Sequence, residues 1–206
     1  MMFQGASAAS FLSGLGIGLS LIVAIGAQNA FVLKQGLLRQ HVLAVCLFCA
    51  ASDAALIAAG VAGAGAIARN APWFLSAMRW GGAAFLLYYG FRSARAARRG
   101  GEALRAEGAA APTLAATLAT IAALTWLNPH VWLDTVVLLG SVSSAQPDRL
   151  AFALGAMSGS FLFFFSLGYG ARLLGPLFVR PVAWRILDAG VALVMWTIAA
   201  TLILGA

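Results

Sequence analysis

Residues 1–33 read MMFQGASAASFLSGLGIGLSLIVAIGAQNAFVL and contain no charged side chain. A transmembrane α-helix needs about 20 predominantly apolar residues to cross about 30 Å of hydrocarbon. The stretch is long enough, and it lacks both the basic leader and the short apolar core of a cleavable signal peptide. We therefore expect it to remain in the protein as a membrane-spanning helix.

The composition of the whole chain supports the same class of protein. Of the 206 residues, 62% are hydrophobic and 9% are charged, whereas soluble domains contain about 45–50% and about 25%. So little charge cannot cover the surface of a soluble globule, and intrinsic disorder requires the opposite composition. The apolar runs are continuous rather than alternating, which favours helices. The sequence therefore predicts an all-α integral membrane protein.

The charged residues divide the chain into six apolar runs, which we interpret as six transmembrane helices. The expected ranges are 8–33, 41–67, 72–91, 113–139, 150–171 and 183–204. We treat 1–206 as a single membrane domain, with half-repeats 1–91 and 113–206 joined by the Gly- and Ala-containing loop 92–112. Three spans in each half would invert the second half relative to the first, which is the 3+3 inverted repeat of many transporters.

The basic residues predict the orientation in the membrane. Ten of the thirteen lie in the connections expected on one side of the membrane: Lys34, Arg39, Arg92, Arg95, Arg98, Arg99, Arg105, Arg172, Arg180 and Arg185. The positive-inside rule places this side in the cytoplasm and both termini outside. The basic tract 92–99 is then a membrane anchor, and we expect no nucleic-acid partner.

Two expected helices contain a break beside polar side chains. The first includes Gly26 followed by Gln28 and Asn29, and the fourth includes Asn128 followed by Pro129. Proline removes a helical hydrogen bond and glycine tolerates the backbone angles of an interruption. One interpretation is a pair of tolerated kinks with internally bonded side chains. We favour the other, a substrate site formed at two breaks in equivalent positions.

Ionisable residues inside the expected spans are the next indication of a site. Asp53, Asp134 and Arg79 lie within three different helices, where a charge must be paired, hydrated or functional. One Asp–Arg pair would use Arg79 as counter-ion and would leave a carboxylate for a cation or a proton. Asp188 lies near a helix end, three residues after Arg185, and an interfacial pair with Arg185 would explain it.

Other motifs predict no cofactor and no metal. Cys46 and Cys49 lie in an apolar run, where cysteine behaves as a small hydrophobe. His130 and Asp134 have the spacing of metal ligands on one helix face, but no third ligand is near. The chain has one lysine and no nucleotide-binding loop. The GxxxG spacings, Gly14 with Gly18 and Gly155 with Gly159, suit close helix packing or a homodimer.

Four segments resemble the LysE family of basic amino acid exporters, in particular its arginine exporter branch. They are GAQNAFVLKQGLLRQ (26–40), SDAALIAAG (52–60), RWGGAAFLLYYG (79–90) and LTWLNPHVWLDTVVLLGS (124–141). The resemblance implies a six-helix exporter of L-arginine or L-lysine in the bacterial inner membrane, driven by protons or the membrane potential. Many relatives have proline at the position of Ala27, so the first break is expected to be gentler here.

The sequence therefore predicts an amino acid exporter with alternating access and a midplane cavity. The residues expected around that cavity are Gln28, Asn29, Asp53, Asn128 and Asp134. Carboxylates would bind the cationic groups of the substrate, since a guanidinium pairs bidentately with a carboxylate. The alternatives are an exporter of divalent metal cations or of neutral amino acids. A further alternative is an intramembrane enzyme with His130 and Asp134 as an acid–base pair.

Overall fold

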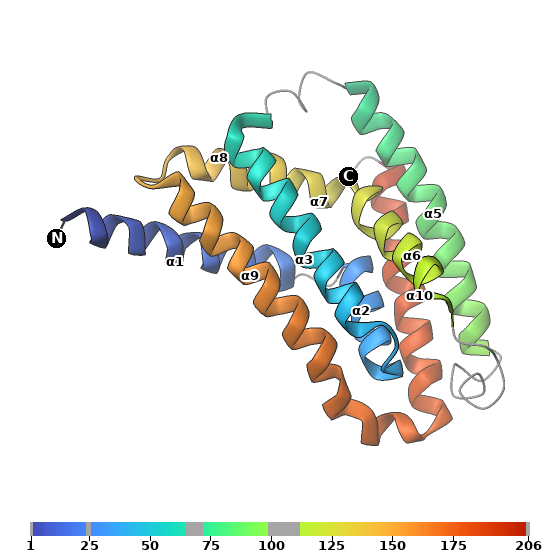
Figure 1. Ribbon diagram of the computed structural model, residues 1–206. Coiled ribbons are helices and arrows are strands. Elements are labelled where there is room, and N and C mark those ends of the chain that lie inside the picture. The colour runs from blue at the N-terminus through green and yellow to red at the C-terminus, as the bar shows by residue number, and fades with distance from the viewer. Residues whose placement is uncertain (1, 24–25, 65–71, 99–111, 205–206) are drawn as a thin grey trace.

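The computed structural model describes residues 2–23, 26–64, 72–98 and 112–204, and these contain helices and no strand (Figure 1). This confirms the expected all-α class. The elements are α1 (Met2–Val23), α2 (Ala27–Leu38), α3 (Val42–Ala59), η1 (Gly60–Ala64), α5 (Pro72–Arg98), α6 (Leu114–Trp126), α7 (Pro129–Trp132), η3 (Leu133–Leu138), α8 (Leu139–Ser144), α9 (Arg149–Gly170), η4 (Ala171–Val179) and α10 (Pro181–Leu204). In hydrocarbon a helix bonds every backbone group internally, which explains this architecture.

The number of candidate spans differs from the expected six. Within the described ranges, four helices are long and apolar enough to cross a membrane: Gly5–Val23, Val42–Gly63, Arg149–Val179 and Pro181–Leu204. A fifth candidate is the pair Leu114–Trp126 and Pro129–Ser144, which is bent by 61°. The helix α5 is 27 residues long, but its arginines lower its hydropathy and keep it outside this set. The structure therefore supports four to five spans and leaves the count of six as a prediction.

The expected boundaries are wrong at three places. The range 8–33 is not one helix, because α1 ends at Val23 and α2 is a separate helix of 12 residues. The range 113–139 is interrupted after Trp126, and helical structure continues to Ser144. The start of the expected loop 92–112 is helical as far as Arg98, and residues 99–111 lie outside the described part of the chain.

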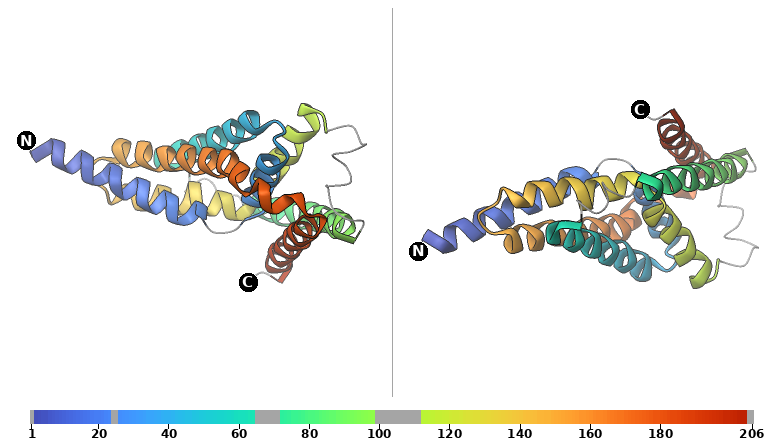
Figure 2. Two further views of the ribbon diagram at one scale, coloured as in Figure 1. Left: turned by 90° about the horizontal axis from the view of Figure 1, so that it is seen from below. Right: turned by 90° about the horizontal axis from the view of Figure 1, so that it is seen from above.

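Glycines bring α1 and α9 into direct backbone contact, and the two helices run side by side (Figures 1 and 2). A Cβ atom on Gly14 would collide with the carbonyl oxygen of Phe152, and one on Gly155 would collide with that of Phe11. The GxxxG glycines Gly14 and Gly155 therefore serve packing within the chain, where small residues allow close approach. Because both glycines are already packed within one chain, their GxxxG spacing no longer indicates a homodimer.

A hydrogen-bonded cap fixes the beginning of α9. The side chain of Asp148 accepts from the backbone N–H of Ala151 at 3.0 Å and from the hydroxyl of Ser7 at 2.7 Å. These bonds favour the ionised carboxyl, so the pKa of Asp148 is lowered, chiefly by the Ala151 N–H and then by Ser7. The cap also ties the first turns of α1 to the loop before α9.

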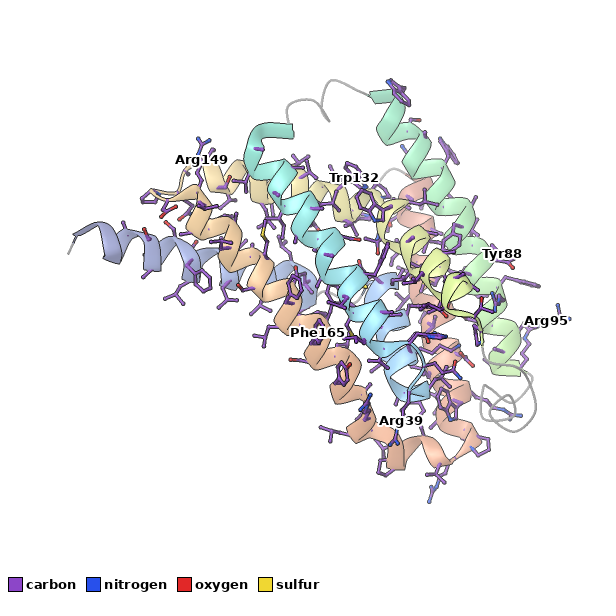
Figure 3. The ribbon with its side chains drawn as sticks, viewed as in Figure 1. Arg39, Tyr88, Arg95, Trp132, Arg149 and Phe165 are labelled. Carbon is purple, nitrogen blue, oxygen red and sulfur yellow. The ribbon has the colours of Figure 1, made fainter. Side chains whose placement is uncertain are left out.

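Basic side chains gather at one end of the molecule. Figure 3 shows Arg39 and Arg95 at the lower end, where α2 and α5 finish, and Arg149 at the opposite end. The turn after α2 is tight, because both Arg39 and His41 have a positive φ, 55° and 52°. Arg39 and Arg95 are both among the residues that the positive-inside rule assigns to the cytoplasm.

Candidate functional site

Each of the two breaks ends one helix and begins another with a defined cap. Gly26 is the N-cap of α2 and is extended, with φ −112° and ψ 170°. Asn128 is the N-cap of α7, and its side-chain oxygen accepts from the backbone N–H of His130 at 3.1 Å. Pro129 occupies the first position of α7, where its missing N–H costs nothing. The first break is thus a full interruption of the helix even with alanine at position 27.

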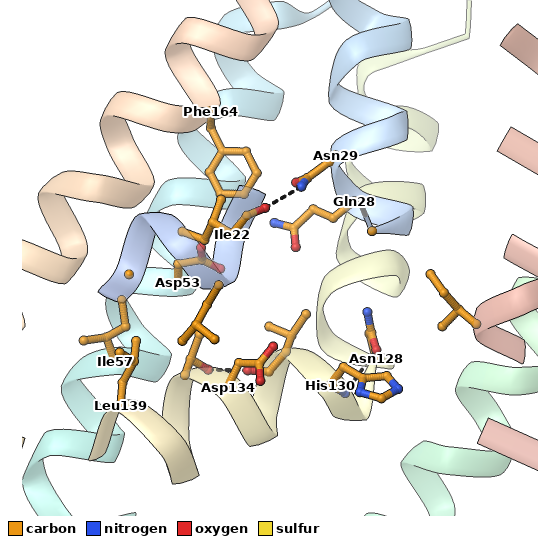
Figure 4. A pocket seen from close by; sticks show the side chains of 16 residues that line it. Ile22, Gln28, Asn29, Asp53, Ile57, Asn128, His130, Asp134, Leu139 and Phe164 are labelled. Carbon is orange, nitrogen blue, oxygen red and sulfur yellow. Dashed lines mark hydrogen bonds between the residues drawn. The ribbon is translucent and has the colours of Figure 1, made fainter. Parts of the chain in front are cut away.

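A cavity of about 260 Å³ lies between these two breaks (Figure 4). Its lining includes all five side chains expected there from the sequence: Gln28, Asn29, Asp53, Asn128 and Asp134. Gly26 lines it as well, and apolar side chains such as Ile57, Leu139 and Phe164 form its walls. A mostly apolar cavity with a few converging polar groups is the usual form of a small-molecule site.

The two carboxylates reach the cavity from different helices. Asp53 projects from α3 and is 3% exposed, and one of its oxygens accepts a hydrogen bond from Ser160 at 3.0 Å. Asp134 is half-buried and belongs to the π-helical segment η3. Single π-helical turns often occur at functional sites, because the extra residue redirects a side chain. Figure 4 shows both carboxylates beside the same space.

The amide side chains come from the beginnings of α2 and α7. The Asn29 amide donates to the carbonyl oxygen of Ile22 at 2.6 Å, which joins α2 to the last turns of α1 across the break. The amide nitrogen of Gln28 is buried and has no hydrogen-bond partner among the described residues. Since an unpaired buried donor is costly, Gln28 is suited to bind an acceptor group of a ligand.

Arg79 does not reach the cavity. Its guanidinium donates to the carbonyl oxygens of Leu202 and Ile203 in the last turn of α10. The last carbonyls of a helix generally lack backbone partners within it and carry partial negative charge, so a cation there is stabilising. The expected Asp134–Arg79 pair is absent from the described geometry, and Arg79 instead caps a helix.

The cap gives a prediction for Arg79→Gln. Loss of the cation should cost about 1–2 kcal/mol and lower the thermal midpoint in detergent by about 2–8 °C. Transport affinity should stay within about twofold, because Arg79 lies outside the cavity. The matched control is Arg149→Gln, which removes an exposed arginine at the other end of the molecule. A large loss of affinity with an unchanged midpoint would restore the counter-ion role.

An ion pair that sequence reasoning missed lies elsewhere in the protein. The Lys34 ammonium contacts a carboxylate oxygen of Asp188 at 2.7 Å, and Asp188 is 0% exposed. The expected interfacial pair of Asp188 with Arg185 is therefore wrong, and Arg185 is exposed. A charged residue usually ends an apolar membrane span, so the sequence predicts Lys34 in a loop, yet Lys34 lies within α2. No local signal in the sequence indicates this pair, because the two residues are 154 positions apart.

No group of three His, Cys, Asp or Glu side chains that could hold a metal ion occurs among the described residues. His130 and Asp134 both line the cavity, and the His130 side chain is exposed. The thiol of Cys46 donates to the carbonyl oxygen of Phe164 within the core, and Cys49 is also buried.

Broken helices, a cavity between them with a few converging polar groups and an apolar exterior are the features of a multi-pass membrane transporter. The chain belongs to the LysE family: the model described as "LysE type translocator" matches residues 19–206. It is 43% identical over 191 residues to the arginine exporter protein ArgO of Salmonella schwarzengrund, covering 92% of this chain and 90% of the relative. The ArgO proteins of Salmonella typhi and Salmonella typhimurium are 42% identical with the same coverage. No solved structure matches the chain.

The family and these relatives indicate a transporter rather than an enzyme. The four sequence segments quoted above lie within the matched range. The apolar helices agree with a multi-pass protein of the inner membrane.

Proposed function

We propose that this protein exports L-arginine, L-lysine or both across the bacterial inner membrane by secondary active transport. The observation that carries the proposal is the shared cavity: two carboxylates and three amide side chains from α2, α3, α7 and η3 line one space. The relatives named as arginine exporters support the choice of substrate.

The cavity is chemically matched to a dibasic amino acid. Asp53 and Asp134 would bind the cationic side chain, because a planar guanidinium bonds a carboxylate in bidentate fashion. The N-terminus of α2 has no side-chain cap. Together with the amide of Gln28, this N-terminus would hold the α-carboxylate, since helix N-termini bind anions. At about 260 Å³ the space suits a ligand of amino-acid size.

Alternating access would follow from an inverted repeat of the two halves. Two close approaches support this arrangement. Gly36 of α2 meets the backbone of Gly168 on α9, and Gly140 of α8 meets the backbone of Gly60 after α3. The first contact joins the helix that follows the first break to α9 in the second half. The second contact joins the helical segment that follows the second break to the end of α3 in the first half. A two-fold relation between the halves requires such a matched pair of contacts. Rocking of the halves would expose the cavity to either side.

The coupling would be an exchange of arginine for a proton. A site that carries either arginine outward or a proton inward moves one positive charge in each direction, so the membrane potential does not oppose it.

The basic end would face the cytoplasm and both termini the outside. A cysteine at position 106 should then stay unlabelled by an impermeant reagent added outside, whereas one at Ser7 should react.

The experiment that tests this function is efflux from vesicles preloaded with labelled arginine, lysine, threonine or a divalent metal ion. Arginine or lysine should leave faster with the protein than without it. Export of threonine alone would indicate a neutral amino acid exporter, and export of the metal alone would indicate a metal exporter. A chemically altered product would indicate an enzyme.

Discrimination between arginine and citrulline tests the role of the carboxylates. Citrulline has nearly the shape of arginine but no charge, and it would leave a buried carboxylate without a counter-charge. With a penalty of about 3 kcal/mol, arginine should be preferred by roughly 100-fold. Canavanine retains a guanidine-like group, so cells that overproduce the protein should resist it. Equal export of citrulline and arginine would contradict carboxylate recognition.

A further inference from the structure

The hydroxyl of Ser160 is a buried donor whose partner is a carboxylate of the candidate site. Ser160 lies on α9, is 0% exposed, and donates to Oδ2 of Asp53 on α3 at 3.0 Å. The same seam between the two helices contains the bond from the Cys46 thiol to the carbonyl oxygen of Phe164. The sequence gives no sign of a functional role for this serine, which lies in the run SGSFLFFF.

Ser158, on the same helix, shows the hydrogen bond that a serine makes when no side chain of another helix accepts from it. The hydroxyl of Ser158 donates to the carbonyl oxygen of Leu154, four residues earlier in its own helix, at 2.7 Å. This is the usual bond of a serine within a helix. The hydroxyl of Ser160 instead donates across the interface between α9 and α3, to Asp53. Its hydrogen bond is therefore specific to Asp53.

The bond decides how Asp53 presents its carboxylate to the cavity. The terminal torsion of an aspartate is broad and roughly two-fold, so an unrestrained carboxylate has no fixed orientation. Ser160 engages Oδ2, which leaves Oδ1 for a ligand. A hydrogen bond to a charged group is among the stronger ones in proteins. Asp134 and His130 also line the cavity.

We infer that Ser160 is a positioning residue for substrate recognition, which holds the Asp53 carboxylate so that one oxygen faces the cationic group of the substrate. This inference rests on the proposed function. Ser160 does not itself line the cavity, so it acts through Asp53. It lies on α9, the same helix that contributes Phe164 to the wall of the cavity.

The test compares Ser160→Ala, Ser160→Thr and the matched control Ser158→Ala in arginine efflux from reconstituted vesicles. Ser160→Ala should raise the KM for arginine about tenfold, the equivalent of one lost hydrogen bond to a charged group, and change kcat by less than about threefold. Ser160→Thr keeps the hydroxyl and should restore most of the affinity. Ser158→Ala should match the unaltered protein. Equal KM values for Ser160→Ala and Ser158→Ala would overturn the inference.

A double-variant cycle separates positioning from packing, and it does not depend on how well the threonine variant folds. In an Asp53→Asn background, Ser160→Ala should cause no further loss of arginine–arginine exchange, because the charge that it orients is gone. The same loss in both backgrounds would show that Ser160 acts independently of Asp53 and would overturn the inference. If the unaltered protein moves no arginine, the proposed function itself fails, and the inference fails with it.

Discussion

Replacement of Asp53 by asparagine should abolish net arginine efflux while arginine–arginine exchange remains detectable. Asp53 is the more deeply buried acid of the cavity, and its side chain accepts a hydrogen bond from Ser160. In the proposed mechanism it alternates between the substrate and a proton, and asparagine cannot carry a proton across. Exchange needs no proton step, so it should survive at reduced affinity. Net efflux down a proton gradient and exchange at equal pH measure the two activities separately.

Asp134→Asn should instead weaken arginine affinity in both assays. Asp134 is half-buried and, in the proposed mechanism, stays ionised as a fixed partner of the guanidinium. Loss of one charge-assisted interaction of about 1.5–3 kcal/mol corresponds to roughly a 10- to 100-fold higher KM. Asp148→Asn is the control, since it changes an acid that lies outside the cavity and asparagine also caps helices. Unaltered net efflux in Asp53→Asn would rule out the proton role.

Removal of one partner of the Lys34–Asp188 pair should strongly destabilise the protein. The pair joins α2 to α10 inside the bundle, and Asp188 is fully buried. A single change such as Lys34→Met leaves a buried carboxylate without its counter-ion, at a cost of about 3–5 kcal/mol. The thermal midpoint in detergent should fall by roughly 6–20 °C, and the amount of protein in the membrane should fall with it.

The double change Lys34→Met with Asp188→Leu should recover most of this loss. Apolar residues of similar volume often replace a buried ion pair with little effect on stability, or with a gain. Lys34→Met and the double variant can be compared by the same melting experiment. A wild-type midpoint in the single variant would show that the pair contributes no stability. Equal losses in the single and double variants would show that packing, rather than charge, governs the site.

The membrane class and the polar residues of the cavity were predictable because they depend on local sequence. Continuous apolar runs predict helices wherever water is absent. Gly26 and Pro129 lie where the backbone breaks, and a break beside amide side chains is a local feature. The acids Asp53 and Asp134 were identified because a charge inside an apolar run needs a partner or a role.

The interactions across helices could not be predicted in the same way. Lys34 and Asp188 are 154 residues apart, and nothing local to either residue indicates the other. Arg79 was paired with an acid because opposite charges are the simplest partners, whereas the structure gives it backbone carbonyls at the end of α10. Ser160 was overlooked because a serine among phenylalanines is ordinary in a membrane helix. In each case the partner is set by tertiary packing.

The most direct test of the central claim, that the cavity binds arginine, is protection of a cysteine placed in its wall. His130→Cys suits this purpose, because His130 lines the cavity and is exposed, whereas Cys46 and Cys49 are buried. Ser144→Cys, at an exposed helix end, is the control. Arginine should slow the reaction of His130→Cys with a small thiol reagent, citrulline should not, and Ser144→Cys should react at the same rate with either. Arginine transport without any such protection would place the binding site elsewhere and contradict the account.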